Sequence, residues 1–344
     1  MSVVNTGNGL RDLWDIGLDA TTVPFTQIPV IDFGPFIDGT PAQRRQAADA
    51  LRHACIHVGF FYAVNHGVPD HVVAATYDAA HRFFDLPLAE KMKLHIGLST
   101  NHRGYVPLLE ENTDPSARGD LHEAFDLALE VPAGDPDVLA GKSLYGPNVW
   151  PADLPGFAEA LQTYYGEVYQ FGRRIFRCFA LALGLDEMFF EPWIGKPLGQ
   201  LRVLHYPSQE GEIDERQIGI GAHSDYECFT ILSTDDIPAL QLLNTAGHWI
   251  AAPPVPGAFT VNVGDMMARW SNDLFRSTVH RAINRSGRER YSIPFFFGPD
   301  FDTPVEVFPT CVSPDHPAKY PPTTAGRYVL SRFDETFSYR KKDG

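Results

Sequence analysis

The sequence is poor in cysteine. Four cysteines occur among the 344 residues, and they lie far apart: Cys55, Cys178, Cys228 and Cys311. Thiols this few and this scattered exclude a disulfide framework and a cysteine-ligated metal cluster. We therefore expect reduced thiols and a cytoplasmic protein.

Basic residues and long apolar runs are also scarce. The chain has 28 Lys and Arg residues against 43 Asp and Glu residues, which gives a formal net charge of -15. A nucleic-acid partner needs a concentrated positive surface, so this balance argues against one. No apolar run is long enough to cross a bilayer and no signal peptide is recognisable, so we expect no membrane partner.

What the sequence does contain is the composition of a globular protein, with 44% hydrophobic and 21% charged residues. Apolar residues recur at helical spacing over 42–58, 70–84 and 156–184, and these stretches are predicted to be amphipathic helices. A further helix is predicted over 323–339. The stretch 95–148 is rich in loops, which is typical of lids and binding loops.

Short apolar stretches separated by Gly and Pro predict strands, most of them in the second half of the chain. They cover residues 28–33, 60–65, 198–206, 239–243, 249–252, 259–263 and 292–297. This spacing indicates an antiparallel sandwich or barrel. We expect an α+β fold with a double-stranded β-helix (jelly-roll) core, supported by N-terminal and flanking helices.

Three residues have the chemistry of a metal centre. His223 and Asp225 are separated by one residue, so their side chains point to the same face of an extended segment. His280 follows a second predicted strand and would be the third ligand. Two imidazoles and one carboxylate leave coordination positions open, as in non-haem Fe(II) sites that activate oxygen. The alternative without a metal is that His223 and Asp225 are a surface pair and His280 is a buried core histidine.

Arg290 and Ser292 are also separated by one residue, ten positions beyond His280. On one strand face, a guanidinium and a hydroxyl can converge on a single carboxylate. Such a pair suits a dicarboxylate that also chelates the iron.

These motifs resemble the isopenicillin N synthase-like branch of the Fe(II)- and 2-oxoglutarate-dependent oxygenases, whose pattern is His-x-Asp, a distal His and Arg-x-Ser. The resemblance extends to Ile28-Pro-Val-Ile-Asp-Phe33, Gly59-Phe-Phe-Tyr-Ala-Val-Asn-His-Gly67 and Arg269-Trp-Ser-Asn-Asp273. It implies Fe(II), 2-oxoglutarate as co-substrate and O2, with release of succinate and CO2. It also implies hydroxylation, or else desaturation or cyclisation, of a small organic molecule.

The resemblance assigns further roles. Tyr206 would help Arg290 and Ser292 to hold the co-substrate, whereas Leu204 stands where many relatives have an asparagine. Six aromatic residues are candidate substrate contacts, although the same residues could equally belong to the core: Tyr105, Phe125, Tyr226, Phe295, Phe297 and Phe333.

Four segments are expected along the chain. They are an N-terminal region of the non-haem dioxygenase type (1–130), a loop and bracing helix (131–195), the jelly-roll core (196–300) and a C-terminal tail with a helix (301–344).

Two other functions agree with the same metal ligands. The first is an oxidase like isopenicillin N synthase or ACC oxidase, which keeps the iron and Arg-x-Ser but does not use 2-oxoglutarate. The second is a zinc hydrolase or a metal-bearing binding protein, because zinc prefers similar ligands.

Overall fold

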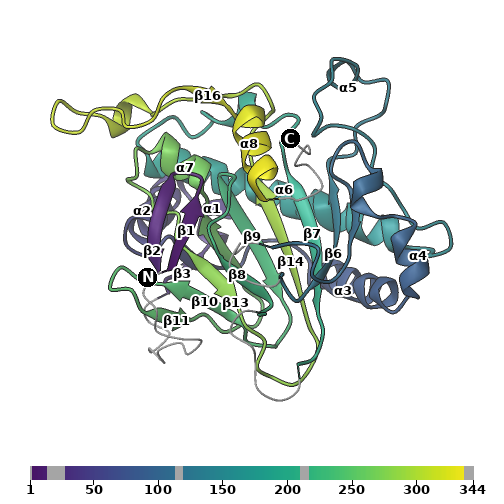
Figure 1. Cartoon of the computed structure of the whole chain (residues 1–344). Coiled ribbons are helices and arrows are strands. Elements are labelled where there is room, and N and C mark those ends of the chain that lie inside the picture. The colour runs from purple at the N-terminus through teal and green to yellow at the C-terminus, as the bar shows by residue number, and fades with distance from the viewer. Residues whose placement is uncertain (1, 14–27, 113–118, 210–216, 337–344) are drawn as a thin grey trace.

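Two mainly antiparallel sheets form the centre of the computed structural model, which describes residues 2–13, 28–112, 119–209 and 217–336 (Figure 1). The larger sheet has the strand order β3-β4-β12-β9-β14-β7-β6-β5. Its strands are β3 (Val30–Asp32), β4 (Phe60–Val64), β5 (Gly104–Val106), β6 (Glu123–Ala128), β7 (Gln200–Tyr206), β9 (Phe229–Thr234), β12 (Phe259–Val263) and β14 (Arg290–Phe297).

The smaller sheet has the order β11-β10-β13-β8. Its strands are β8 (Ile220–His223), β10 (Leu240–Leu243), β11 (Trp249–Ala251) and β13 (His280–Ala282). Side chains from both sheets line one cavity, so the two sheets enclose it between them. This arrangement is the double-stranded β-helix, and it confirms the predicted α+β jelly-roll fold.

Helices surround the sheets (Figure 1). They are α1 (Gly34–Asp38), α2 (Pro41–His57), α3 (Asp70–Phe84), α4 (Leu88–Met92), α5 (Pro136–Leu139), α6 (Phe157–Ala182), α7 (Asp265–Trp270) and α8 (Ala325–Thr336). The start of α2 is set by a capping box, in which Thr40 and Gln43 exchange side-chain to backbone hydrogen bonds. Pro41 at the first helical position favours the same start.

The remaining elements are short. Two hairpin strands, β1 (Ser2–Thr6) and β2 (Gly9–Leu13), precede the sheets, and β15 (Pro304–Val305) pairs with β16 (Thr323–Thr324). Three single turns of 3-10 helix complete the described chain: η2 (Ile96–Leu98), η3 (Glu191–Trp193) and η4 (Pro309–Cys311).

The longest helix, α6, packs against the larger sheet through its apolar side. Phe176 of α6 meets Phe229 of β9 and Phe297 of β14, with ring centroids 4.9 and 5.1 Å apart. One turn earlier, Gly172 leaves room for Phe297, because a Cβ at Gly172 would lie 2.1 Å from its ring. The helix therefore lies close to the sheet and braces it.

The predicted helices and strands are present within a few residues of their expected ends. One difference lies in the region that we expected to be rich in loops: the stretch 95–148 contains β5 and β6, which extend the larger sheet. In addition, residues 2–13, for which no element was predicted, form a hairpin. The predicted C-terminal helix is present as α8, and its expected last turn, 337–339, lies outside the described residues.

The close approach at Gly172 gives a test of the packing. We expect Gly172→Ala to destabilise the protein by about 1–3 kcal/mol, because its methyl group would overlap Phe297. Gly166 lies in the same helix, and a Cβ added there would have no other atom within 4 Å. Gly166→Ala should therefore stabilise the protein by roughly 0.5–1 kcal/mol through helix propensity. Urea denaturation gives the free energy of unfolding of each variant. If Gly172→Ala and Gly166→Ala changed it equally, the close packing at Gly172 would be contradicted.

Candidate active site

The pairing of β8 with β13 brings two histidines together. His223 is the last residue of β8, His280 is the first residue of β13, and the two are direct partners in the antiparallel ladder. Asp225 lies two residues beyond β8, with Oδ1 3.6 Å from Nε2 of His223 and 3.6 Å from Nε2 of His280. The ligand atoms of all three lie within 4.8 Å of one another. The predicted His-Asp-His group is therefore present.

Hydrogen bonds fix which atoms of this group face the common centre. The Nδ1–H of His223 donates to the carbonyl of Gly221 at 2.8 Å, and that of His280 donates to the carbonyl of Thr278 at 3.1 Å. Because a carbonyl can only accept, both rings carry their proton on Nδ1 and present the lone pair of Nε2.

The carboxylate of Asp225 is held in a similar way. Its Oδ2 accepts a hydrogen bond from Nδ2 of Asn262 at 2.6 Å and a short one from the hydroxyl of Thr230. These two partners occupy one oxygen and leave Oδ1 facing the histidines. Outer hydrogen bonds of this kind orient metal ligands and tune their affinity.

The protonation states also suit a metal ion. Burial and the neighbouring His223 lower the pKa of His280 to about 4, so its imidazole is neutral near pH 7. Burial disfavours the charged form of Asp225, but His280, His223 and the two hydrogen bonds outweigh it and lower the pKa of this carboxyl. The neutral imidazole of His280, the Nε2 atom of His223 and the carboxylate of Asp225 form a set of donors that fits a divalent cation such as Fe(II).

A second group lies on the paired strands β14 and β7. Arg290 is the ladder partner of Tyr206, and its Cζ lies 4.6 Å from the centre of the tyrosine ring. Ser292 bridges the two, 3.4 Å from Nη1 of Arg290 and 3.4 Å from the hydroxyl of Tyr206. Arg290 is buried, and its Nε has no hydrogen-bond partner among the described residues. A buried guanidinium in this state can bind a carboxylate.

One cavity joins the two groups. It has an empty volume of about 1040 Å³, part of which is open to solvent. The three metal-ligand candidates, Arg290, Ser292 and Tyr206 all line it, and so does Leu204, the ladder partner of Ser292. Its other lining residues include apolar Phe60, Leu232, Pro294 and Phe296, and polar Glu111, His122, Gln200 and Arg202.

The polar wall is a compact ionic cluster. Arg202 binds Glu111 through both terminal nitrogens, at 2.9 and 2.8 Å, and Nε2 of His122 lies 3.0 Å from the same carboxylate. Burial opposes ionisation of Glu111, but Arg202 and His122 outweigh it and hold its pKa well below the usual value. The hydrogen bond to Glu111 raises the pKa of His122 against the effect of burial. The cluster is thus charged but internally compensated.

The structure separates the six aromatic candidates into two sets. Tyr226 and Phe333 line the cavity, with ring centroids 6.4 Å apart. The other four lie among core residues and are not cavity residues: Tyr105, Phe125, Phe295 and Phe297. The hydroxyl of Tyr105 donates to Glu123 at 2.5 Å instead.

Several cavity residues were not among the predicted ones. Phe296 and Pro294 share the strand face of Ser292 and Arg290, because positions 290, 292, 294 and 296 alternate with the core positions. The same period-two rule that predicted Arg290 and Ser292 would have found them. Other cavity residues come from distant segments of the chain, and no local sequence pattern predicts them. Examples are Asn262, Thr230 and the Arg202 cluster.

Comparisons with known proteins place the chain in a family. Residues 28–153 match the model for the N-terminal region of non-haem dioxygenases described from morphine synthesis, and residues 198–299 match the 2OG-Fe(II) oxygenase superfamily. A 2-oxoglutarate-Fe(II) type oxidoreductase of Emericella nidulans is 37% identical over 326 residues, which cover 92% of this chain and 93% of that protein. The chain therefore belongs to the 2OG-Fe(II) oxygenase superfamily.

Solved structures agree. A full-length Neurospora crassa protein in complex with alpha-KG and thymine superposes with a TM-score of 0.81 at 29% identity, covering 90% of this chain and 96% of that one. JOX2 in complex with 2OG, Fe and JA gives a TM-score of 0.73 at 30% identity, covering 93% and 87%.

This protein is accordingly a non-haem iron dioxygenase that uses Fe(II), 2-oxoglutarate and O2 and acts on a small molecule. The comparisons favour this function over the oxidase without 2-oxoglutarate and over the zinc hydrolase. Within the described residues, no helix is long and apolar enough to cross a membrane.

The hydrogen bond from Thr230 to Asp225 can be tested by metal binding. Thr230→Val keeps the shape of the side chain but removes the donor, and we expect it to weaken Co(II) or Fe(II) binding by about 10- to 100-fold. Ser233→Ala is the matched control, since Ser233 lies on the same strand and bonds to Tyr77 instead. Anaerobic calorimetry gives both dissociation constants, and an unchanged affinity in Thr230→Val would refute this role.

The alternation on β14 can be tested by unfolding. Phe295→Ala should cost about 3–5 kcal/mol, because it empties a fully buried site beside Tyr165. Phe296→Ala enlarges a cavity that already exists, so we expect a loss of only about 1–2 kcal/mol. Denaturant titration of the two variants gives the comparison, and a larger loss at Phe296 would overturn the assignment of faces.

Proposed function

We propose that His223, Asp225 and His280 hold Fe(II) in this dioxygenase. The observation that carries the proposal is the convergence of two Nε2 atoms and one carboxylate oxygen on a point inside a cavity that also holds a buried arginine. The Nδ1 hydrogen bonds keep the imidazole rings in place, and Asn262 and Thr230 keep the carboxylate in place. This support reduces the reorganisation that metal binding requires.

Arg290 and Ser292, with help from Tyr206, are proposed to hold the distal carboxylate of 2-oxoglutarate. Arg290 offers a buried positive charge, and Ser292 and Tyr206 offer hydroxyl groups 3.4 Å from each other. Leu204 pairs with Ser292 and lines the same cavity, so it gives the carbon chain of the co-substrate an apolar contact.

With Fe(II), 2-oxoglutarate and O2 bound, the centre supplies the oxidation that yields succinate, CO2 and an oxidised substrate. The protein binds and orients the two organic molecules and keeps water away from the reacting atoms. Phe60, Leu232 and Phe296 line the cavity and serve this exclusion. Hydroxylation is the proposed outcome, with desaturation or ring closure as variants of the same chemistry.

The proposed substrate is a small molecule with an apolar part and a polar group. Tyr226, Phe296 and Phe333 provide aromatic surface for the apolar part. Gln200 and Arg202 line the cavity from β7 and provide hydrogen bonds for the polar group. The relatives fit such a range, since the Neurospora crassa protein was solved with thymine and JOX2 with JA.

We also propose the division of the chain into 1–130, 131–195, 196–300 and 301–344, with the third segment as the catalytic jelly roll. A net charge of -15 supports a function without nucleic acid. The four cysteines are unpaired thiols, which supports a reducing, cytoplasmic location.

Removal of the arginine charge tests the co-substrate site. Fe(II) and 2-oxoglutarate added without oxygen should give the weak visible charge-transfer band of the chelate in the wild type. In Arg290→Ala, the loss of the charge should weaken 2-oxoglutarate binding by at least about 30-fold, or roughly 2 kcal/mol. The titration of the band with 2-oxoglutarate measures this change.

Arg288→Gln is the control, because Arg288 lies two residues away and is exposed. It should bind 2-oxoglutarate as the wild type does. Equal affinity in Arg290→Ala would show that another group holds the distal carboxylate, and absence of the band in the wild type would contradict co-substrate chelation.

A further inference from the structure

The N-terminal hairpin of β1 and β2 packs behind the metal centre. Figure 1 shows it in purple, beside α7. The side chain of Val4 is buried in a cluster with Ala222, Trp249 and Val279. Ala222 immediately precedes His223, and Val279 immediately precedes His280. Because side chains alternate along an extended chain, Ala222 and Val279 point away from the side that carries the two histidines. Val4 therefore covers the outer side of the strands that carry His223 and His280.

The tip of the hairpin reaches a buried carboxylate, Asp265, at the start of α7. The backbone N–H of Gly7 donates to Oδ2 of Asp265 at 2.7 Å, and Nδ2 of Asn8 donates to its carbonyl oxygen at 2.9 Å. Asp265 is fully buried. Both residues of the turn thus contact this one residue.

Asp265 in turn holds the segment between the metal ligands. Its Oδ2 accepts a hydrogen bond from the hydroxyl of Ser224 at 2.9 Å, and its backbone N–H donates to the carbonyl of Asp225 at 2.8 Å. Ser224 lies between His223 and Asp225 in the sequence. A continuous set of hydrogen bonds therefore runs from the hairpin through Asp265 to the ligand segment.

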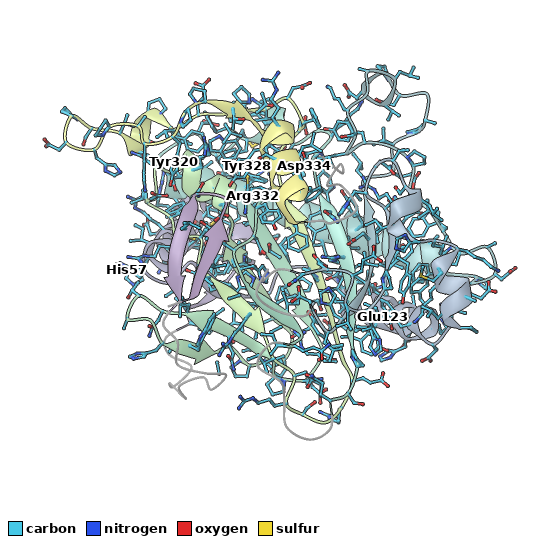
Figure 2. The ribbon with its side chains drawn as sticks, viewed as in Figure 1. His57, Glu123, Tyr320, Tyr328, Arg332 and Asp334 are labelled. Atoms are coloured by element: carbon cyan, nitrogen blue, oxygen red, sulfur yellow. The ribbon has the colours of Figure 1, made fainter. Side chains whose placement is uncertain are left out.

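The fit at the tip is tight. A Cβ at Gly7 would lie 2.0 Å from the hydroxyl oxygen of Tyr328 and 2.9 Å from Oδ2 of Asp265. Tyr328 belongs to α8 and is labelled in Figure 2, together with Arg332 of the same helix. The turn thus fits between α7 and α8, and only a residue without a side chain can occupy the position of Gly7.

We propose that the hairpin is a positioning element of the metal centre, which holds Ser224 and Asp225 through Asp265 and so raises metal affinity. This inference rests on the proposed roles of His223, Asp225 and His280. The hairpin precedes residue 28, where the first family match begins, so the matched segments do not include it.

The test uses the full-length protein and Co(II) as a spectroscopic probe in oxygen-free buffer. Gly7→Ala should displace the turn and weaken Co(II) binding by about 10-fold or more, as loss of outer support does at other metal sites. Leu10→Ala is the matched control, because Leu10 is 74% exposed on the same hairpin. Its Co(II) dissociation constant should equal that of the wild type.

Two further measurements separate positioning from general stability. Asn8→Ala removes a single hydrogen bond to Asp265 and should weaken Co(II) binding in the same direction, while urea unfolding of the metal-free protein changes little. The effects of Gly7→Ala and Ser224→Ala on Co(II) affinity should be less than additive, since both act through Asp265.

Unchanged Co(II) affinity in Gly7→Ala and Asn8→Ala would overturn the inference and leave the metal centre intact. Full additivity with Ser224→Ala would overturn the route through Asp265. Failure of the wild type to bind Co(II) would instead refute the proposed ligands, which is a separate result.

Discussion

The register between β8 and β13 is the constraint on which the site depends. His223 and His280 meet because they are direct partners in the antiparallel ladder. Side chains alternate between the two faces of a sheet, so a slip of one residue would turn one imidazole to the outer face. The buried contacts of Ala222 and Val279 behind the strands stabilise the observed register. Thus packing on the opposite side of the sheet helps to set the positions of the two histidines proposed as ligands.

Asp225 is subject to a different constraint, because it lies beyond the end of β8. Burial of an ionised carboxylate is costly unless hydrogen bonds compensate it. Asn262 from β12 and Thr230 from β9 supply these bonds. The larger sheet therefore positions Asp225, whereas the smaller sheet positions the two histidines. The His-Asp-His group proposed to hold the metal therefore depends on both sheets in their native arrangement.

Alternation of side chains within one strand is the feature of the site that the sequence could predict. Arg290 and Ser292 share a face of β14, and this prediction needed no knowledge of distant contacts. His223 and Asp225 also face one cavity as predicted, although Asp225 lies beyond the end of β8. The same alternation separates Phe295 and Phe297, which lie in the core, from Phe296, which lines the cavity, and the predicted substrate contacts did not follow it.

Tyr105 shows the other limit of the sequence. Its partner Glu123 is 18 residues away and also binds Lys91, so this buried polar network becomes visible only in three dimensions. The strand β6, which contains Glu123, could not be predicted from the sequence for the same reason. Charged side chains are usually exposed, so Glu123 and Asp126 argue against a buried strand when their partners are unknown. In the structure both are buried because they pair with basic residues.

The two ends of the cavity differ in how their arginines are compensated. Arg202 is paired with Glu111 through two contacts and with Asp126 at 3.1 Å, so its charge is compensated within the protein. Arg290 donates to the hydroxyl of Ser292 and packs on the ring of Tyr206, and its charge also acts on the Asp235 carboxyl, where it opposes the rise in pKa that burial causes. In a protein with a net charge of -15, an anionic co-substrate depends on such a local cation. The cavity thus offers its two proposed organic ligands different surroundings: Arg290 beside two hydroxyl groups at one end, and a carboxylate-paired Arg202 at the other.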